Sequence, residues 1–311
     1  MHVLVIRPGA LGDVLLTLPA LQALQARFPE AAIEVMGDLA VLHWLPGRTV
    51  VRAVSSFDRV DLIELFQPGA QPSPALRHYL DQFDLIISYA TAPEHVFARN
   101  LMRAARGKVI CWDARPNQNM RMHMSAYLLQ PLRSLGVTEN VDLPHIMLTE
   151  GDRREAEQWW QEHGLGGRLS VAIHPGSGSA AKNWPAERFA AVARHVRQEQ
   201  GMQILLVSGP ADEAVIAAVE RDLGGQGYVL AHELPLPLLA GLLAQCWAYV
   251  GNDSGVSHLA AAVGTRVVAI FGPTDAAVWA PCGALVRVVQ AAVPCAPCSV
   301  EQRRDCSRRV C

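Results

Sequence analysis

Short apolar runs alternate with amphipathic stretches along the whole chain. Residues 3–6 are four apolar side chains in succession, which is typical of a strand buried on both faces of a parallel sheet. A loop with Pro8, Gly9 and Gly12 follows, and from 14 to 28 apolar side chains recur at steps of three and four residues. This spacing predicts a helix with one buried face. The chain therefore begins with a strand, a glycine loop and a helix.

The same alternation continues to the end of the chain. Further strands are predicted at residues 32–36, 50–54, 83–88, 108–111, 169–173, 203–207, 228–231, 248–250, 266–271 and 286–289, and helices at 75–82, 185–200, 211–223, 236–246 and 256–263. Pro185 suits the first position of its helix, and Gly264 suits the end of the last one. The polar helical stretch at 149–163 is interpreted as the connection between two domains. We expect an α/β fold with two doubly wound, Rossmann-like domains at residues 1–150 and 151–311.

Composition fits two globular cores and gives no support for a nucleic-acid partner. Of 311 residues, 50% are hydrophobic and 18% are charged, and the formal net charge is −2. The beginning of the chain lacks the pattern of a signal peptide, and an odd number of cysteines, seven, suggests reduced thiols. We therefore expect a cytoplasmic protein. Prolines divide the uncharged stretch at 234–252, so we expect no membrane span there.

Asp13 follows the first strand and opens the first helix. One interpretation is a helix N-cap, whose side chain accepts hydrogen bonds from free backbone N–H groups. The other is a functional carboxylate, because open α/β sheets bind ligands at the carboxyl ends of their strands. Two anion-binding loops predicted in the other half of the chain favour a general base over a cap alone.

The first of these loops, at residues 174–185, joins a predicted strand to a predicted helix. Gly176 and Ser177 would let backbone N–H groups approach an anion, and Lys182 places a positive charge just before the helix. The spacing to the lysine differs from that of a Walker A loop. A plain turn is the alternative, but phosphate binding is favoured.

The second loop has Asp253, Ser254 and Gly255 at the start of a helix rich in small residues. Ser254 and Gly255 would form a second anion site, and two such sites in one domain suit a diphosphate. The alternatives are that Asp253 or Ser254 caps the helix and that His258 is an internal histidine. After another predicted strand, Asp212 is placed to bond a ribose hydroxyl.

Taken in order, these motifs resemble those of glycosyltransferase family 9, which contains the ADP-heptose:lipopolysaccharide heptosyltransferases. The resemblance covers nearly the whole chain and rests on Arg7 and on residues 10–13, 174–176, 182–185, 253–255, 258–262 and 271–275. It implies a GT-B fold, in which two Rossmann-like domains face a cleft. The C-terminal domain would bind the nucleotide-sugar donor, and the N-terminal domain would bind the acceptor.

The resemblance also implies roles for individual residues. Asp13 matches the general base that takes a proton from the acceptor hydroxyl as it attacks the anomeric carbon with inversion. Lys182 matches the lysine that contacts the donor phosphates. Arg7 and Gly12 are assigned to the acceptor. The other donor-binding positions carried over are Gly176, Ser177, Asp212, Asp253, Ser254, Gly255 and His258. Such enzymes need no metal ion or other cofactor, because the lysine and helix ends stabilise the leaving diphosphate.

Two departures from the family pattern affect specificity. The first loop has Pro8 and Gly9 where relatives often carry serine, so contacts with the acceptor are expected to differ. The acid that binds ribose in the best-known members aligns with Ala211 or Asp212, which leaves the nucleotide base of the donor open.

Basic residues gather between positions 99 and 121, in the domain assigned to the acceptor. Arg115 and Arg121 belong to a group of six cations that has a single acid, Asp113, among them. We interpret these two arginines as contacts for an anionic glycolipid acceptor. The alternatives are a solvated face and peripheral contact with the anionic inner face of the cell membrane.

Four cysteines near the end of the chain have a spacing similar to that of a zinc knuckle. They are Cys295, Cys298, Cys306 and Cys311. The second pair is separated by four residues and has no histidine nearby, so thiols are favoured over zinc.

The expected activity is that of an inverting glycosyltransferase. It would move a heptose or a related sugar from a nucleoside-diphosphate sugar, with ADP-heptose as the leading donor, to an acceptor of the lipopolysaccharide-core type. One alternative is a nucleotide-sugar epimerase on the same architecture, which would need further acid–base residues in the donor domain. Another is a non-catalytic nucleotide-sugar-binding protein, against which Asp13 and Lys182 together argue.

Overall fold

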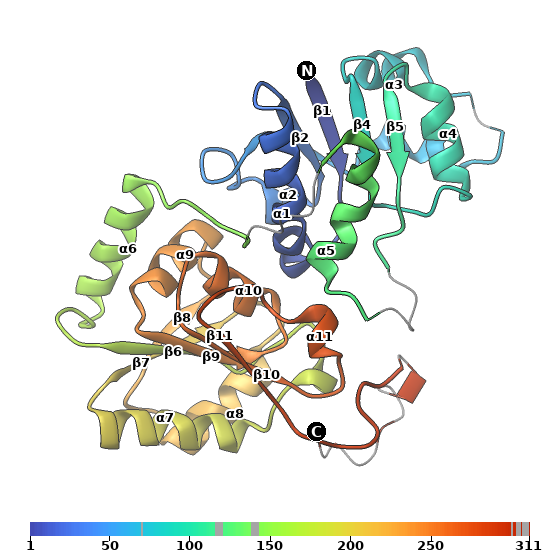
Figure 1. Ribbon diagram of the computed structural model, residues 1–311. Helices are drawn as coiled ribbons and strands as arrows, with labels where there is room; N and C mark the ends of the chain where they lie inside the picture. Colours follow the sequence, from blue (N-terminus) through green and yellow to red (C-terminus); the bar gives the residue numbers. More distant parts are fainter. Residues whose placement is uncertain (70, 116–120, 138–142, 300, 303–305, 307–310) are drawn as a thin grey trace. The chain divides into compact units, whose positions relative to one another are not determined.

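The computed structural model describes residues 1–311 apart from residues 70, 116–120, 138–142, 300, 303–305 and 307–310. The chain forms two compact units, Met1–Asp142 and Leu143–Cys311. Each unit is a parallel β-sheet with helices on both faces (Figure 1). The division falls between residues 142 and 143, whereas the sequence suggested a boundary between 150 and 151.

The first unit is built on parallel strands in the order β3-β2-β1-β4-β5. Their bounds are β1 (His2–Ile6), β2 (Ala32–Gly37), β3 (Val51–Ser56), β4 (Leu85–Ser88) and β5 (Lys108–Cys111). This is the strand order of one Rossmann half, extended on the far side of β1. The direction of winding reverses between β1 and β4, and ligands of such sheets bind at the carboxyl ends of the strands beside this reversal.

Helices cover both faces of the first sheet. They are α1 (Leu11–Arg27), α2 (Leu39–Leu42), α3 (Pro74–Leu80), α4 (Val96–Ala104), α5 (Met124–Leu129) and the 3₁₀ helices η1 (Val60–Phe66) and η2 (Gln130–Leu135). Helix α1 packs against α5, and η1 packs against α3 and α4. Leu4 and Ile6 enter the core formed with η1, α3 and α4, so the alternation along β1 turns the equally buried Val3 and Val5 toward the opposite face.

The second unit has the complete Rossmann order, β11-β10-β9-β6-β7-β8, and all of its paired strands are parallel. Their bounds are β6 (Ser170–His174), β7 (Gln203–Ser208), β8 (Val229–His232), β9 (Ala248–Asn252), β10 (Val267–Phe271) and β11 (Val286–Gln290). Winding reverses between β6 and β9. The loops that follow these two strands contain the glycine-serine motif and the Asp-Ser-Gly motif, so the topology places both motifs at the switch point of one sheet.

The helices of the second unit are again divided between two faces. They are α6 (Glu150–Glu162), η3 (Ala180–Lys182), α7 (Ala186–Gln200), α8 (Glu213–Leu223), α9 (Leu236–Gln245), α10 (Gly255–Ala262) and α11 (Ala276–Trp279). Helices α7 and α8 lie together on one face of the sheet, and α9 and α10 lie on the other (Figure 1). Helix α6 packs against α9, so the polar stretch interpreted as a domain connection is part of the second unit.

Every strand predicted from the sequence is present, with its ends within two residues of the prediction. Gly264 has a φ of 89° and directly follows the C-cap of α10, as predicted. One prediction at a helix end was wrong: Pro185 is the N-cap of α7 and not its first helical residue. Helix α1 begins at Leu11, so the alternative of Asp13 as its N-cap does not hold. Asp13 is the third helical residue, and its carboxylate accepts the backbone N–H of the N-cap residue, Ala10. Within the described residues, no helix combines the length and the apolar character needed to cross a membrane.

Candidate functional site

Asn252, at the end of β9, holds both ends of the glycine-serine loop. Its side chain is fully buried; the amide nitrogen donates to the carbonyl of Pro175 (2.7 Å), and the amide oxygen accepts from the backbone N–H of Trp184 (3.0 Å). Within the loop, the Ser177 hydroxyl donates to the side-chain oxygen of Asn183 (2.6 Å). Sequence reasoning gave Asn252 no role, although it lies between an apolar strand and the Asp-Ser-Gly motif.

Lys182 ends the short helix η3 and reaches the second motif. Its Nζ lies 3.0 Å from Oδ2 of Asp253, which also accepts a hydrogen bond from Thr274 Oγ1 (2.7 Å). The Asp253 side chain is 8% exposed, whereas that of Lys182 is 24% exposed. The carboxylate thus holds the ammonium group at the edge of the sheet, and part of the lysine side chain stays open to solvent.

Gly176 lies against the carboxylate of Asp212, and a side chain at position 176 would overlap both of its oxygens. Asp212 is buried, and its Oδ2 accepts hydrogen bonds from His174 Nε2 (2.9 Å) and from the Gly209 N–H (2.8 Å). Burial alone would raise the pKa of Asp212, but the bonds and charge of His174 and the Gly209 amide outweigh it, so the pKa lies below its usual value. The carboxylate predicted to bond ribose is turned into the protein.

The Asp-Ser-Gly motif forms the start of α10. Ser254 is its N-cap, and the Ser254 Oγ accepts a hydrogen bond from the Ser257 N–H (3.4 Å). Gly255 is the first helical residue, so its N–H group lies at the positive end of the helix dipole. His258 lies one turn further along α10 and is buried.

Asp13 is held from two sides in the first unit. Its Oδ1 lies 3.1 Å from Nη2 of Arg7, and its Oδ2 accepts a hydrogen bond from the Ala10 N–H (3.0 Å). The Asp13 side chain is 36% exposed, and it closes over Gly9, which has a φ of 147°. Asp13 therefore presents a fixed and accessible carboxylate directly after β1. Gly12 lies beside it in the first turn of α1.

Arg7 is buried beneath this carboxylate. Its other guanidinium nitrogens donate to Thr17 Oγ1 (3.0 Å) and to the carbonyl of Pro8 (2.9 Å). Burial lowers the pKa of Arg7, although the charge of Asp13 opposes the shift. The structure thus brings Arg7 and Asp13 together, with the hydrogen bonds of the arginine directed within the unit.

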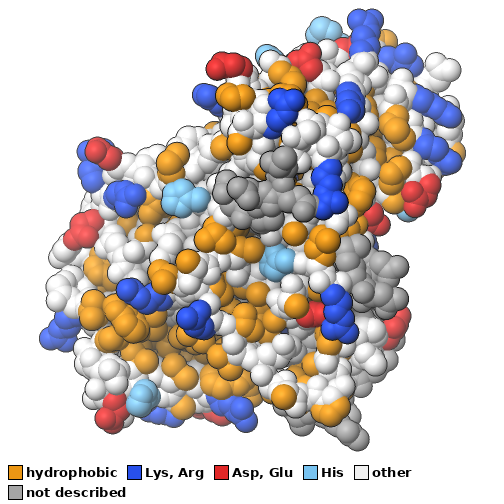
Figure 2. Space-filling view, in the orientation of Figure 1, with side chains coloured by type: hydrophobic (Ala, Val, Ile, Leu, Met, Phe, Trp, Pro, Cys, Tyr) orange, Lys and Arg blue, Asp and Glu red, His pale blue; other side chains and the backbone are white. Residues whose placement is uncertain are grey.

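The predicted acceptor arginines lie on the surface of the first unit. Arg115 and Arg121 are both exposed, and residues 116–120 between them lie outside the described part of the chain. Four more exposed cations, Arg99, Arg103, Arg106 and Lys108, belong to the region of α4 and β5. Basic side chains are frequent over this part of the unit (Figure 2).

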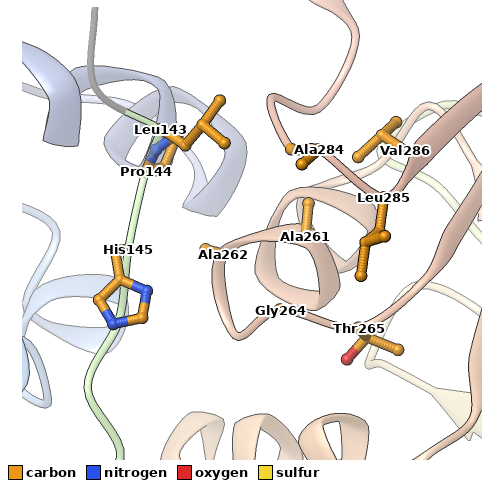
Figure 3. Close-up of a pocket in the computed structure, with 11 residues that line it drawn as sticks. Leu143, Pro144, His145, Ala261, Ala262, Gly264, Thr265, Ala284, Leu285 and Val286 are labelled. Atoms are coloured by element: carbon orange, nitrogen blue, oxygen red, sulfur yellow. The ribbon is translucent and has the colours of Figure 1, made fainter.

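In the described part of the chain no metal cluster is found at these residues, and a cavity of the second unit lies elsewhere. Among the described residues, no group of three or more His, Cys, Asp or Glu is placed to hold a metal ion, and these residues include the four C-terminal cysteines. A mostly apolar cavity of about 190 Å³ is lined by Leu143, Ala262, Thr265 and Leu285, among others (Figure 3). Thr265 and Leu285 precede β10 and β11, so this cavity lies at the edge of the sheet opposite to Asp253.

Comparison with known proteins identifies the family. Residues 113–307 match the family model described as glycosyltransferase family 9 (heptosyltransferase). The chain belongs to glycosyltransferase family 9.

Curated relatives match the chain over most of its length. A lipopolysaccharide heptosyltransferase 2 from Salmonella typhimurium is 26% identical over 93% of this chain and 88% of the relative. A lipooligosaccharide heptosyltransferase 2 from Haemophilus ducreyi is 28% identical over 88% of this chain and 84% of the relative. The chain is a glycosyltransferase of this family.

Solved structures confirm the fold. A family 9 glycosyltransferase from Veillonella parvula has a TM-score of 0.76 at 23% identity, covering 93% of this chain and 86% of its own. ADP-heptose lipopolysaccharide heptosyltransferase II from E. coli has a TM-score of 0.72 at 21% identity, covering 93% and 90%. The predicted family and GT-B fold are thereby confirmed, while the roles of individual site residues stay predictions.

Replacing Gly176 with alanine is expected to destabilise the second unit, because the new methyl group overlaps the Asp212 carboxylate. Overpacking of this kind lowers the free energy of unfolding by about 1–3 kcal/mol. Gly178→Ala in the same loop is the matched control, since nothing lies within 4 Å of the position its Cβ would take. Urea unfolding of both variants checks the prediction, and equal stability of the two would contradict it.

Proposed function

We propose that the protein is an inverting heptosyltransferase that moves a heptose from a nucleoside-diphosphate heptose, with ADP-heptose as the leading donor, to an acceptor of the lipopolysaccharide-core type. The names of its relatives support the heptose and the acceptor class. An E. coli heptosyltransferase solved with ADP, at 19% identity and a TM-score of 0.70, supports the nucleotide. The observation that carries the catalytic proposal is the fixed, accessible carboxylate of Asp13.

The donor diphosphate is proposed to bind at the switch point of the second sheet. The partly exposed side chain of Lys182 and the first amide of α10, at Gly255, supply positive charge there. Gly176 and Ser177 contribute the close approach of the loop backbone. Negative charge grows on the leaving diphosphate as its bond to the anomeric carbon breaks, so groups fixed in advance stabilise the transition state more than the bound donor. The proposal assigns this role to Lys182 and the helix end and needs no metal ion or other cofactor.

Asp13 is proposed to act as the general base. The acceptor hydroxyl attacks the anomeric carbon on the face opposite to the diphosphate, and its proton passes to the Asp13 carboxylate. This attack inverts the configuration at that carbon. The contacts with Arg7 and the Ala10 N–H hold both carboxylate oxygens, so the base is positioned before the acceptor binds.

The acceptor is proposed to be an anionic glycolipid that meets the basic surface of the first unit. Arg115 and Arg121 are exposed and carry charge of the required sign. The same surface suits peripheral contact with the anionic inner face of the cell membrane, so we propose a cytoplasmic enzyme that works close to that surface.

The alternative of a nucleotide-sugar epimerase would need acid–base groups in the donor unit that reach the sugar. The pair formed there by His174 and Asp212 is of the right chemical type, but both side chains are buried. The comparisons also favour transferases over this alternative.

Asp13→Asn is expected to reduce the rate of sugar transfer by about 10²–10⁴-fold, because the amide cannot accept the acceptor proton. Affinity for the donor nucleotide should stay near that of the wild type, since the change lies in the other unit. Transfer assays together with nucleotide titration measure both quantities. Asp58→Asn, an exposed change in the same unit, is the control, and full activity of Asp13→Asn would refute the base.

Lys182→Met is expected to weaken nucleoside-diphosphate binding by about tenfold or more, since a hydrogen bond to a charged group contributes about 1.5–3 kcal/mol. A thermal-shift series with ADP, GDP and UDP measures this effect and identifies the preferred base, because a bound ligand raises the apparent stability. Lys108→Met, at an exposed lysine of the first unit, should leave the series unchanged. Unaltered nucleoside-diphosphate binding by Lys182→Met would show that the lysine does not contact the donor.

Reversing the charge of Arg115 and Arg121 to glutamate is expected to raise the KM for an anionic acceptor and to leave nucleotide affinity unchanged. The control reverses the exposed Arg52 and Arg168 instead, so that both proteins have the same net charge. Steady-state kinetics at several salt concentrations measure the effect, which should shrink as salt screens exposed charges. An acceptor KM equal to that of the control would exclude the two arginines from acceptor binding.

A further inference from the structure

Three buried side chains connect the loops at the switch point of the second sheet. Oδ2 of Asp212, after β7, lies 2.9 Å from Nε2 of His174 at the end of β6. The other ring nitrogen, Nδ1, lies 3.3 Å from Oγ of Ser254, which follows β9. All three residues are at most 7% exposed. Loops from three different strands are therefore joined by one continuous set of side-chain contacts.

The carboxylate of Asp212 gives the direction of the first contact. Asp212 has a lowered pKa and is ionised near neutral pH, so it accepts from the His174 Nε2–H. The other ring nitrogen, Nδ1, faces the hydroxyl of Ser254. The hydroxyl of Ser257 donates to the carbonyl of Asn252 (2.5 Å), so the Ser254 hydroxyl has two acceptors within reach, the Ser257 Oγ and the His174 Nδ1, each at 3.3 Å.

Asp212 is enclosed on its remaining side. Its carboxylate lies against Gly176, where any side chain would overlap both of its oxygens, and its Oδ2 also accepts from the Gly209 N–H. A carboxylate that binds a ribose diol needs an oxygen directed outward. This one holds its own neighbours and is 5% exposed.

We propose that Asp212 is a positioning residue of the donor site rather than a contact for the ribose. It fixes the ring of His174, and the ring fixes both the start of the glycine-serine loop and the Ser254 cap of α10. Asp212 would thus set the spacing between the glycine-serine loop and the start of α10, which are proposed to bind the diphosphate. The proposal rests on the proposed function only in taking this switch point as the place where the diphosphate binds.

Displacement of a binding loop by about 1 Å is enough to cost up to about 10²-fold in the rate of a reaction that depends on position. Loss of the Asp212 side chain should therefore lower both the affinity for diphosphate and the rate of transfer. A purely electrostatic role of Asp212 predicts the opposite change in diphosphate affinity. If Asp212 acted only through its negative charge, its removal would make the site bind anions more tightly.

The decisive experiment compares Asp212→Ala, Asp212→Asn and the control Glu213→Gln, which removes an exposed carboxylate from the neighbouring position. Calorimetry measures the binding of inorganic pyrophosphate, ADP, 2′-deoxy-ADP and 3′-deoxy-ADP. We expect Asp212→Ala to weaken pyrophosphate and ADP by a similar factor of about tenfold or more. The preference for ADP over the deoxy analogues should match that of the wild type. The affinities of Asp212→Asn should lie between those of Asp212→Ala and the wild type, because the amide oxygen can still accept both hydrogen bonds.

Two outcomes would overturn the proposal. Unchanged or tighter pyrophosphate binding in both Asp212 variants would show that the residue does not position the anion site. Loss of the preference for ADP over its deoxy analogues in Asp212→Ala would show that the residue touches ribose. Asp212→Asn keeps the shape of the side chain, so it decides the matter if Asp212→Ala fails to fold.

Nitrogen-15 NMR of the histidine rings tests the connection without a nucleotide. Asp212→Asn should shift the Nε2 resonance of His174 and Ser254→Ala the Nδ1 resonance, whereas Glu213→Gln should shift neither. A His174 spectrum insensitive to both changes would refute the connection. If the wild type binds pyrophosphate but no nucleoside diphosphate, the proposed function fails while the positioning role is still measured. If it binds neither, both fail.

Discussion

The side-chain amide of Asn252, at the end of β9, is fully buried. It forms hydrogen bonds with both ends of the loop between β6 and α7. A buried amide that lost these partners would be costly, so the loop and the strand end hold each other in place. These hydrogen bonds also affect the residues inside the loop. Because the ends of the loop are fixed, Lys182 is brought to Asp253 and Gly176 to Asp212, so the positions of these charged groups depend on one uncharged side chain.

The two units contain ion pairs of opposite polarity. In the first unit the cation, Arg7, is buried with 5% of its side chain exposed, and the anion, Asp13, is 36% exposed. In the second unit the anion, Asp253, is 8% exposed, and the cation, Lys182, is 24% exposed. Each buried member fixes the accessible one. The first unit thereby offers a negative group suited to accept a proton, and the second offers a positive group suited to receive a phosphate.

The strands and the motif loops follow directly from the sequence, because buried parallel strands are short apolar runs and the loops after them carry unusual residues. The short helices α4 and α5 were not predicted, since polar residues such as Asn100 and Ser125 interrupt their apolar pattern although both are buried. The side-chain partners could not be predicted either. His174 meets Asp212 and Ser254 across 38 and 80 residues of chain, and only the strand order brings them together. The burial of Asp212 against Gly176 is another feature that depends on this strand order.

Gly176 and Asp212 share one volume, in which either a side chain at 176 or a carboxylate at 212 fits, but not both. The two positions are therefore not independent in sequence space. A chain that is to acquire a larger residue at 176 must first lose the acid at 212, because the opposite order passes through a variant in which the two side chains overlap. A redesign of this loop should therefore treat positions 176 and 212 as a pair.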